Sequence, residues 1–305
     1  MTQALFPAVS EYEKECREQK KRRLNVSGVL KILGVSRSGY LCFKKKVPSD
    51  RELRKCAIKE RILEIYHDSH QNYGAPKITE CLRKEGEIIS EKTVGNYMKE
   101  MGIKAQYIKP YTVTTIDSDF SSKLKNILEK NFNPSAPDAA WCSDITYIWT
   151  SEGFVYLTSI MDLYSRKIIS WVLSDTLEAK WVIEAVSKAK AARKVEKPLV
   201  MHTDRGIQYV CKEYINATEG MERSYSKKAY PWDNACIESF HALIKREWLN
   251  RFKIADYEHA HSLVFEYIET FYNTVRIHSH CGYISPNEYE KEYRKKFAEM
   301  EFRAA

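Results

Sequence analysis

The sequence lacks the features of an exported or membrane-embedded protein. It has no apolar run near the length of about 18 residues that a membrane-spanning helix needs. It also lacks a basic leader followed by a short apolar stretch and a small-residue cleavage site, the pattern of a signal peptide. We therefore expect a protein that is neither exported nor membrane-spanning.

Paired cysteines are absent too. The eight cysteines are scattered and none forms a Cys-x-x-Cys pair. Several lie within apolar patterns, which is typical of reduced core cysteines in a cytosolic protein. His67 and His70 are the nearest approach to a zinc set, and no cysteine pair follows them, so we expect no zinc.

Positive charge is unevenly spread along the 305 residues, whose net charge is +8. Residues 1–110 hold 23 Lys and Arg against 14 Asp and Glu, whereas the remainder holds 26 against 27. The basic excess therefore lies entirely in the first third. This asymmetry favours a DNA-binding front part attached to a near-neutral second part, although a merely soluble basic domain would give the same count.

The first basic segment has the pattern of a helix-turn-helix. Residues 26–33 form a short apolar helix, Gly34 makes a turn, and Ser36 can cap a second helix. In that arrangement the first residues of the second helix face base edges, here Arg37 and Ser38, with Lys44, Lys45 and Lys46 near the phosphates. Many helical hairpins share this pattern without touching DNA.

A second helical unit follows the boundary at Pro48 and Ser49. We expect helices over 50–67, around Ile78–Leu82, and from Ser90, which would cap the last of them. Residues 105–137 lack periodicity and contain three prolines, so they read as a linker with one short helix at 123–130.

The rest of the chain alternates strands and helices. The pattern predicts three successive strands at 145–150, 154–162 and 167–173, a helix at 179–193, a strand at 199–203, a short helix around 212–216 and a strand at 222–226. A helix follows Pro231, with Asp233 or Asn234 as its cap, and residues 255–296 are expected to be helical.

Three carboxylates lie on these rigid elements. Asp144 is inside the strand-like run 141–149, Asp204 ends the strand that begins with Leu199, and Glu238 lies beside the buried stripe of its helix. Carboxylate oxygens suit Mg²⁺ or Mn²⁺, and two such ions about 4 Å apart promote phosphoryl transfer. On spacing alone most of the 41 acidic residues are solvated surface charge. Among rival acids, we expect Asp162 to stabilise a turn with Ser165 or Arg166.

Several motifs occur in one order and together resemble a known family. They are Asp144–Tyr147, Met161–Lys167, His202–Tyr209, Asp233–Phe240 and Tyr272–His278. In this order they resemble the integrase-type transposases of bacterial insertion sequences, specifically the second-frame (OrfB-type) product of the IS-three family. The resemblance covers nearly the whole chain. One departure is the spacing between Asp204 and Glu238, where 33 residues stand and the family usually has 35.

The resemblance implies a fold, an activity and a catalytic site. The fold is α/β: a ribonuclease H-like mixed five-stranded sheet flanked by helices, preceded by all-α helix-turn-helix DNA-binding modules. Asp144, Asp204 and Glu238 would be the catalytic residues and would bind two Mg²⁺ (or Mn²⁺) ions per active site. The activity would be metal-dependent strand cleavage and strand transfer at insertion-sequence ends. The partners would be double-stranded DNA, further copies of the chain and an upstream-frame protein, in the nucleoid-associated bacterial cytoplasm.

The resemblance also implies DNA contacts outside the acidic trio. Those on the second helical unit would be Lys92, Thr93, Asn96 and Lys99, and those near the trio Lys227, Lys228, Lys245 and Arg246. His241 would either point to the scissile phosphate or lie on the helix surface. The tail would buttress the catalytic domain, and we expect no metal at His278, His280 and Cys281.

The resulting domain limits are helix-turn-helix module 1–47, second helix-turn-helix domain 50–105, linker 106–137, catalytic core 138–251 and helical extension 252–305. Two alternatives stay open. One is a helix-turn-helix DNA-binding protein with an inactive core, an alternative that the shortened spacing between Asp204 and Glu238 favours. The other is a ribonuclease H-like nuclease without strand transfer.

Overall fold

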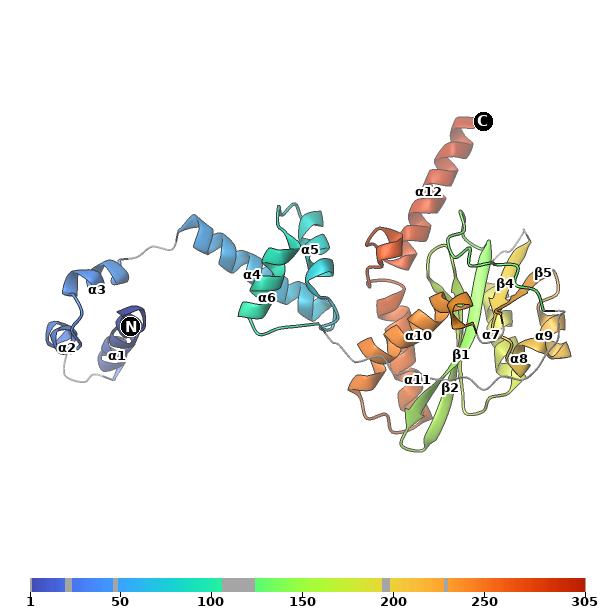
Figure 1. The fold of residues 1–305 in the computed structure, drawn as a ribbon, viewed down its shortest axis with the longest axis horizontal. Coiled ribbons are helices and arrows are strands. Elements are labelled where there is room, and N and C mark those ends of the chain that lie inside the picture. Colours follow the sequence, from blue (N-terminus) through green and yellow to red (C-terminus); the bar gives the residue numbers. More distant parts are fainter. Residues whose placement is uncertain are drawn as a thin grey trace. The chain divides into compact units, whose positions relative to one another are not determined.

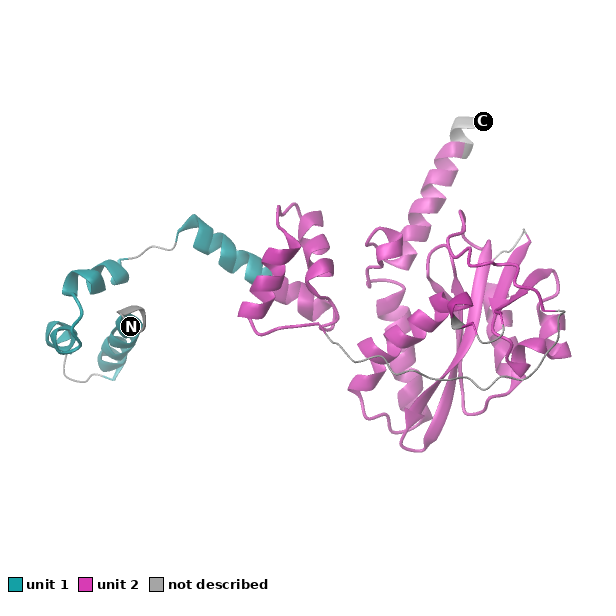
Figure 2. Cartoon of the chain, in the orientation of Figure 1, with its two compact units in different colours: residues 1–61 teal, residues 62–305 magenta. Residues whose placement is uncertain are grey.

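A computed structural model describes residues 2–19, 24–45, 49–105, 124–193, 198–227 and 230–304. The chain divides into two compact units, residues 1–61 and 62–305 (Figure 2). Lys228 lies outside the described residues, as do Lys46 and most of the expected linker. No helix in the described ranges is long and apolar enough to cross a membrane.

The first unit begins with the three helices α1 (Thr2–Glu18), α2 (Val26–Ile32) and α3 (Arg37–Lys44). They pack through buried apolar side chains, among them Val9, Leu30 and Tyr40. The Ser36 side chain accepts a hydrogen bond from the Gly39 amide at 2.9 Å, as a helix cap does. The expected pair of short helices with a Ser-capped second member is therefore confirmed.

Three further helices follow, α4 (Asp50–Asp68), α5 (Ala75–Lys84) and α6 (Glu91–Glu100). They coincide with the three predicted for this stretch. Ser90 caps α6 by accepting a hydrogen bond from the Thr93 amide at 3.2 Å. Ile78 and Leu82 of α5 and Val94 of α6 are completely buried, and their packing stabilises this group of helices.

The second unit contains a five-stranded mixed sheet of order β3-β2-β1-β4-β5 (Figure 1). The strands β1 (Ala140–Thr150), β2 (Gly153–Asp162) and β3 (Ile168–Ser174) form an antiparallel meander. The strands β4 (Leu199–Thr203) and β5 (Met221–Tyr225) continue the sheet parallel to β1. All five predicted strands are present, and together with the flanking helices they confirm the predicted fold class.

The first strand begins earlier than predicted, at Ala140 rather than 145. Residues Ala140–Ser143 pair with Val200–Thr203 of β4. Pairing with this strand, which is distant in sequence, lengthens β1 at its N-terminal end. Asp144 therefore lies within β1, as the strand-like run 141–149 predicted, at the point where pairing with β4 stops.

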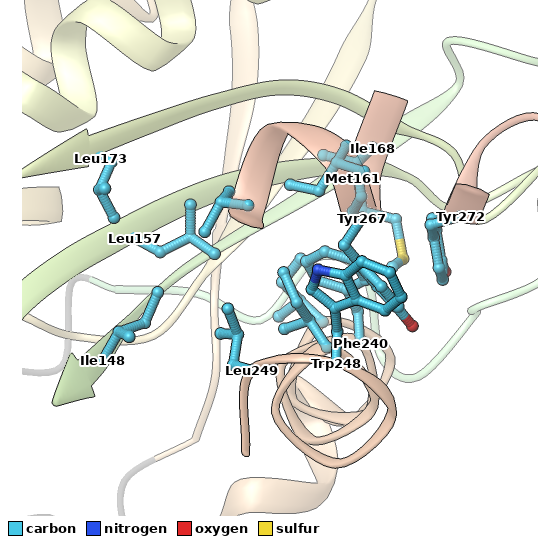
Figure 3. Packing of buried hydrophobic residues seen from close by; sticks show 14 of the residues in the cluster. Ile148, Leu157, Met161, Ile168, Leu173, Phe240, Trp248, Leu249, Tyr267 and Tyr272 are labelled. Atoms are coloured by element: carbon cyan, nitrogen blue, oxygen red, sulfur yellow. The ribbon is translucent and has the colours of Figure 1, made fainter. Parts of the chain in front are cut away.

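Helices cover both faces of the sheet. On one face α7 (Ala179–Ala192) buries Val182, Ala185 and Ala189 against the sheet. On the other face lie α10 (Ala235–Glu247) and the C-terminal helices. Figure 3 shows the second core, where Phe240 and Trp248 meet side chains of the meander and of the tail. The predicted stripe Ile237, Phe240, Ile244 and Trp248 is buried, which fixes the orientation of α10.

The helix predicted at 123–130 is wrong over its described part. Residues 124–130 contain no helix. The amides of Ile127 and Leu128 both donate to the Ser224 hydroxyl at 2.9 Å, and the Tyr225 amide donates to the Lys125 carbonyl. These contacts with β5 lie about 100 residues away in sequence, so local periodicity cannot reveal them.

Short helices connect the remaining elements. Between β4 and β5 lie α8 (Ile207–Val210), which was not predicted, and α9 (Lys212–Ala217), which was. Single 3-10 turns occupy η1 (Pro231–Asp233) and η2 (Leu249–Arg251).

The tail is largely helical, as predicted. It comprises α11 (Tyr257–Phe265), the π-helical turn η3 (Glu266–Tyr272), the 3-10 turn η4 (Ser279–Cys281) and α12 (Pro286–Ala304). The helical tail is interrupted between η3 and α12. In this interruption the Asn273 side chain bonds to β3: it accepts from the Ile168 amide and donates to the Ile168 carbonyl, both at 3.0 Å.

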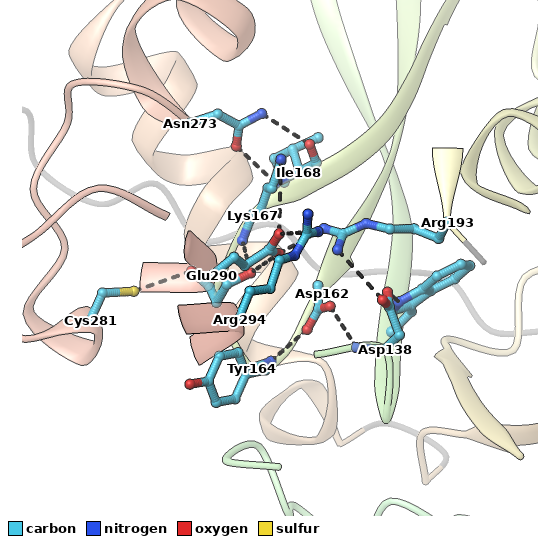
Figure 4. Close-up of polar contacts among 12 residues, drawn as sticks. Asp138, Asp162, Tyr164, Lys167, Ile168, Arg193, Asn273, Cys281, Glu290 and Arg294 are labelled. Carbon is cyan, nitrogen blue, oxygen red and sulfur yellow. Dashed lines mark hydrogen bonds and ion pairs between the residues drawn. The ribbon is translucent and has the colours of Figure 1, made fainter. Parts of the chain in front are cut away.

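A buried polar network fastens the tail to the sheet (Figure 4). Glu290 of α12 accepts from the Arg193 guanidinium and from the Ser165 hydroxyl, both at 2.7 Å. The expected buttressing of the core by the tail is therefore confirmed. Asp162 stabilises its turn as predicted with Arg166, whose amide donates to the Asp162 carbonyl at 2.8 Å. The Asp162 carboxylate in addition accepts from the amides of Tyr164 and Asp138, both at 2.8 Å.

Candidate active site

Two of the predicted acids follow one another across adjacent parallel strands. Ser143 of β1 pairs with Thr203 of β4, and Asp144 and Asp204 are the next residues of each strand. Neighbouring strands lie about 4.8 Å apart, and residues at matching positions of a parallel pair project to the same face. The topology of the sheet therefore brings together two acids that are 60 positions apart in the sequence.

The helix α10 crosses this point with its N-terminal end. The Asn234 side chain donates to the Ser143 carbonyl at 3.4 Å, beside the start of α10. Glu238 lies in the first turn of that helix. This contact, made by the residue before α10, places the start of the helix next to Asp144. Glu238, the third acid, therefore lies near the other two.

The expected side-chain cap of α10 is wrong. Asn234 occupies the N-cap position without a capping hydrogen bond from its side chain. The Asp233 carboxylate instead accepts from the Asn126 side chain at 2.8 Å and from the Lys227 amide at 2.9 Å. Asp233 therefore fixes the loop before α10 to the segment along β5.

The three acids share one electrostatic field. Burial and, after it, the negative charges of Asp144 and Asp204 together raise the pKa of Glu238 to about 7. Within the described residues no hydrogen bond or ion pair engages the Glu238 carboxylate, although its amide donates to the Asn234 carbonyl at 3.2 Å. A carboxylate held near two others is a site where a cation is favourable.

His241, one turn after Glu238, is not on the helix surface. It is 5% exposed, and its two ring nitrogens lie 3.4 Å from Asp144 Oδ2 and 3.3 Å from the Ser159 hydroxyl. Ser159 is the cross-strand partner of Asp144 on β2. The imidazole thus lies between Asp144 and Ser159 and fixes the orientation of the Asp144 side chain.

The donor set fits a divalent cation such as Mg²⁺ because it consists of carboxylates that repel one another. No group of three His, Cys, Asp or Glu side chains in the described ranges is already arranged around a common point as metal ligands. Asp204 Oδ1 accepts a hydrogen bond from the Gly206 amide at 2.9 Å. The residues that would bind the ion are Asp144, Asp204 and Glu238.

Of the two predicted phosphate-binding residues on α10, one lies beside the acids. Lys245 places its ammonium 4.3 Å from the centre of the Tyr147 ring. Burial lowers its pKa, while the nearby Asp144 charge opposes that shift. Arg246 lies near Lys77 of α5, whose pKa it helps to lower. The structure therefore brings Lys245, but not Arg246, into the surroundings of Asp144.

Of the remaining predicted DNA contacts that the structure describes, all but the half-buried Thr93 are exposed. Lys227 is exposed and follows β5, next to the loop that precedes α10. On α6, Lys92, Asn96 and Lys99 are exposed, and the Thr93 hydroxyl lies 2.9 Å from the Ser90 hydroxyl.

On α3, Arg37 and Ser38 are exposed, as base-reading residues require. Lys44 near the end of that helix is engaged within its own unit, because its ammonium pairs with Glu13 at 2.5 Å. The hydrogen bond from Lys44 lowers the pKa of Glu13.

The C-terminal histidines serve the fold. Burial lowers the pKa of His278 to about 3 and also lowers that of His280. His280 Nε2 lies 2.9 Å from the Tyr164 carbonyl, and the Cys281 thiol donates to the Ser165 carbonyl at 3.2 Å. These side chains join the tail to the turn between β2 and β3.

Two supporting residues of the site were not predicted. Ser159 holds His241, and the buried Tyr209 hydroxyl lies 3.1 Å from the Ser143 hydroxyl, directly before Asp144. Tyr209 stands in the motif that begins with His202, which was the one available signal. Ser159 had none, because only its pairing with β1 gives it a role.

Three family models match parts of the chain. Family models described as integrase core domain match residues 134–231 and 219–286, and one described as HTH-like domain matches residues 53–111. The structure is similar to the catalytic core of BIV integrase, with 16% sequence identity, 52% of this chain and 99% of that chain covered, and a TM-score of 0.40.

Two relatives are similar over most of the chain. The transposase InsF for insertion sequence IS3A of Escherichia coli (strain K12) is 32% identical over 279 residues, covering 90% of this chain and 97% of the relative. The transposase for insertion sequence element IS904 of Lactococcus lactis is 34% identical over 246 residues, covering 80% and 97%. The chain therefore belongs to the IS-three (IS3) family of insertion-sequence transposases, enzymes with an integrase-type (DDE) catalytic core.

Proposed function

We propose that this transposase cuts DNA at the ends of an insertion sequence and joins those ends to target DNA, using Asp144, Asp204 and Glu238 as its catalytic residues. The observation that carries the proposal is the shared field of the trio: Asp144 and Asp204 follow paired residues of neighbouring strands, and both charges raise the pKa of Glu238. Family membership supports the same assignment.

The trio would bind divalent metal, Mg²⁺ or Mn²⁺, with two ions per site. When bound, such ions polarise the phosphodiester and favour deprotonation of the attacking hydroxyl. Asp144 lies within β1 and Asp204 directly follows β4, so both would be held by a rigid sheet, and Glu238 lies in the first turn of α10. His241 keeps the Asp144 carboxylate in place.

The reaction would proceed in two in-line displacements at phosphorus. First, water attacks the phosphodiester at the element end, the bond to the 3′ oxygen breaks, and a free 3′-hydroxyl results. That hydroxyl then attacks a target phosphodiester and loses its proton to solvent. The bond between the target phosphorus and its 3′ oxygen breaks, and the target strand leaves with a 3′-hydroxyl that takes up a proton from solvent. The protein contributes positioning and charge, and no covalent protein–DNA intermediate is needed.

DNA would lie across several of the predicted contacts. Lys245 lies beside Asp144, Lys227 follows β5, and Arg246 follows Lys245 on α10. Lys228, outside the described residues, belongs to the same set of proposed contacts. Lys92, Thr93, Asn96 and Lys99 would bind DNA through α6, and Arg37 and Ser38 would bind it through α3. The chain would have the domain limits predicted from its sequence. Pairing two element ends implies at least two copies of the chain, and an upstream-frame partner would add DNA recognition. The site of action would be the bacterial cytoplasm, at the nucleoid.

A strand-transfer assay tests the proposal. The substrates are the terminal repeats that flank the gene, with supercoiled target DNA and Mg²⁺. We expect the wild type to cut and join, Glu238→Gln to be at least about 100-fold slower, and the matched control Glu222→Gln, an exposed acid on β5, to match the wild type. Binding without chemistry in all three proteins would favour an inactive DNA-binding protein. Cutting without joining by the wild type would favour a nuclease.

A further inference from the structure

An exposed aromatic cluster lies on the strand that carries Asp144. It consists of Tyr147 and Trp149 of β1 and Phe154 of β2, here named the hairpin aromatic cluster. Their exposed fractions are 42%, 64% and 48%. Side chains of this size are normally buried, and a contiguous exposed group of them marks a binding surface.

The three rings form a rigid unit. Trp149 and Phe154 are cross-strand partners with ring centroids 4.8 Å apart, and Tyr147 lies 5.3 Å from Phe154. Both pairs meet edge to face, so ring faces stay available to a ligand. The two long strands β1 and β2 pair in one register along their length and hold the rings, so a ligand would find them already arranged.

The cluster lies next to the active site along an open edge of the sheet. Of the described strands, β4 pairs with β1 only as far as Ser143, and beyond it the β1–β2 hairpin continues without a neighbour on that side (Figure 1). At about 3.3 Å per residue, Tyr147 is about 10 Å and Trp149 about 17 Å from Asp144 along the strand. Asp144 and Tyr147 point to opposite faces, but at an open edge a ligand can reach both.

Lys245 connects the two places chemically. Its ammonium lies 4.3 Å from the centre of the Tyr147 ring and within the field of Asp144. A cation between an acidic metal-binding site and an aromatic surface suits a polymer that alternates phosphate with flat rings. A protein partner would need no such cation beside the acids, so the charge favours a nucleic acid.

We propose that the hairpin aromatic cluster binds an unpaired nucleobase of the DNA strand whose phosphate lies at the acidic trio. The inference rests on the proposed function and adds a binding site to it. With a rise of about 3.4 Å per base step, the cluster corresponds to a base roughly three to five positions from the reacting phosphate. Stacking on Trp149, with Lys245 holding an intervening phosphate, would keep the end of the duplex open at the site.

The test uses the full chain and element-end duplexes that carry 2-aminopurine at each of the first six positions from the cleavage site. The binding step is read in the Glu238→Gln background, so that it is independent of chemistry. We expect unstacking at one position three to five bases from the cut, its loss in Trp149→Ala, and its return in Trp149→Phe. The matched control is Phe297→Ala, an exposed aromatic on α12.

The cleavage step is read in the otherwise unchanged chain. We expect Trp149→Ala to cut fully paired ends roughly 10-fold more slowly, as for one lost base stack, and to recover on ends mismatched at that position. An equal defect on paired and mismatched ends would overturn the inference, as would behaviour like Phe297→Ala. So would sedimentation showing that Trp149→Ala alone dissociates a DNA-free oligomer, since the cluster would then be a protein interface. Absence of cutting by the wild type on every substrate, with unstacking retained, would contradict the proposed function alone.

Discussion

Two glutamates on the same helix have opposite surroundings. Glu247, at the C-terminal end of α10, is buried, and Arg276 donates to both of its oxygens at 2.6 Å. The Tyr267 hydroxyl donates a third hydrogen bond at 2.8 Å. Glu238, nine residues earlier, faces two other acids instead of a guanidinium. The hydrogen bonds of Arg276 lower the pKa of Glu247 against the effect of burial, whereas burial and Asp144 raise that of Glu238.

The difference separates structural acids from functional ones. A buried carboxylate that already has a guanidinium and a hydroxyl has no use for a further cation, and its role is to hold the tail to α10. A carboxylate beside two others is destabilising in the folded chain unless a cation joins them. The same reasoning places Glu290, bound by Arg193, with Glu247. The proposed catalytic role of Glu238 agrees with this contrast, because its carboxylate lacks the neutralising partner that Glu247 and Glu290 have.

The largest expected effect is on folding, at Glu247. Glu247→Ala leaves the Arg276 charge buried without its partner, and we expect it to lower the free energy of unfolding by about 3–5 kcal/mol. Glu238→Ala should change it by less than about 0.5 kcal/mol at pH 6, and Glu292→Ala on α12 serves as the exposed control. Urea denaturation measures all three. Equal losses for the two α10 variants would contradict the contrast.

Metal binding should separate the same two residues. Mg²⁺ at 100 times its Kd stabilises a single-site protein by about 2.7 kcal/mol. We expect a gain of that order in the wild type and little or none in Glu238→Gln. The readout is the thermal midpoint with Mg²⁺ against EDTA, without DNA. A full gain in Glu238→Gln would remove Glu238 from the metal site.

Tyr267 tests how fully Glu247 is satisfied. Tyr267→Phe removes one hydrogen bond to a charged acceptor but leaves Arg276 in place, so we expect a loss of about 1.5 kcal/mol in unfolding free energy. Tyr12→Phe, at an exposed position of α1, is the control. A loss as large as that of Glu247→Ala would mean that the hydroxyl, and not Arg276, carries the interaction.

The smallest effect concerns pH. The pKa of Glu238 is raised from 4.5 to about 7 in the folded chain. The folded state therefore binds this proton more tightly, and the contribution to stability is present below pH 4.5 and lost as pH rises through 7. In EDTA we expect Glu238→Gln to exceed the wild type by about 1 kcal/mol at pH 8, after allowance for solvent screening. The difference should vanish near pH 4, and a constant difference would contradict the assignment.

Much of the fold was predictable because its signals are local. Alternating β-branched and aromatic residues marked the strands, and the stripe Ile237, Phe240, Ile244 oriented α10. The candidate acids were found from motif order, while the sheet explains their convergence through the pairing of Ser143 with Thr203. Their catalytic role stays a proposal, as do the domain limits and the DNA contacts.

The features that could not be predicted depend on distant partners. The segment 124–130 has helical composition, yet Ser224 of β5 binds its amides. Asp233 was assigned to cap its own helix, and Asn126, 107 positions away, binds it instead. Two interpretations of His241 stayed open because the sequence does not show that Ser159 on β2 contacts its ring. In each case a long-range hydrogen bond decided between local alternatives.

The central claim is that Asp144, Asp204 and Glu238 bind divalent metal at the meeting point of β1, β4 and α10. Anomalous diffraction from crystals soaked in Mn²⁺ tests it most directly. We expect a peak within about 2.2 Å of oxygens of Asp144 and Asp204, with Glu238 on the same or a second ion, and its loss in Asp144→Asn. Manganese bound elsewhere in the wild type, with no peak at the trio, would contradict the account.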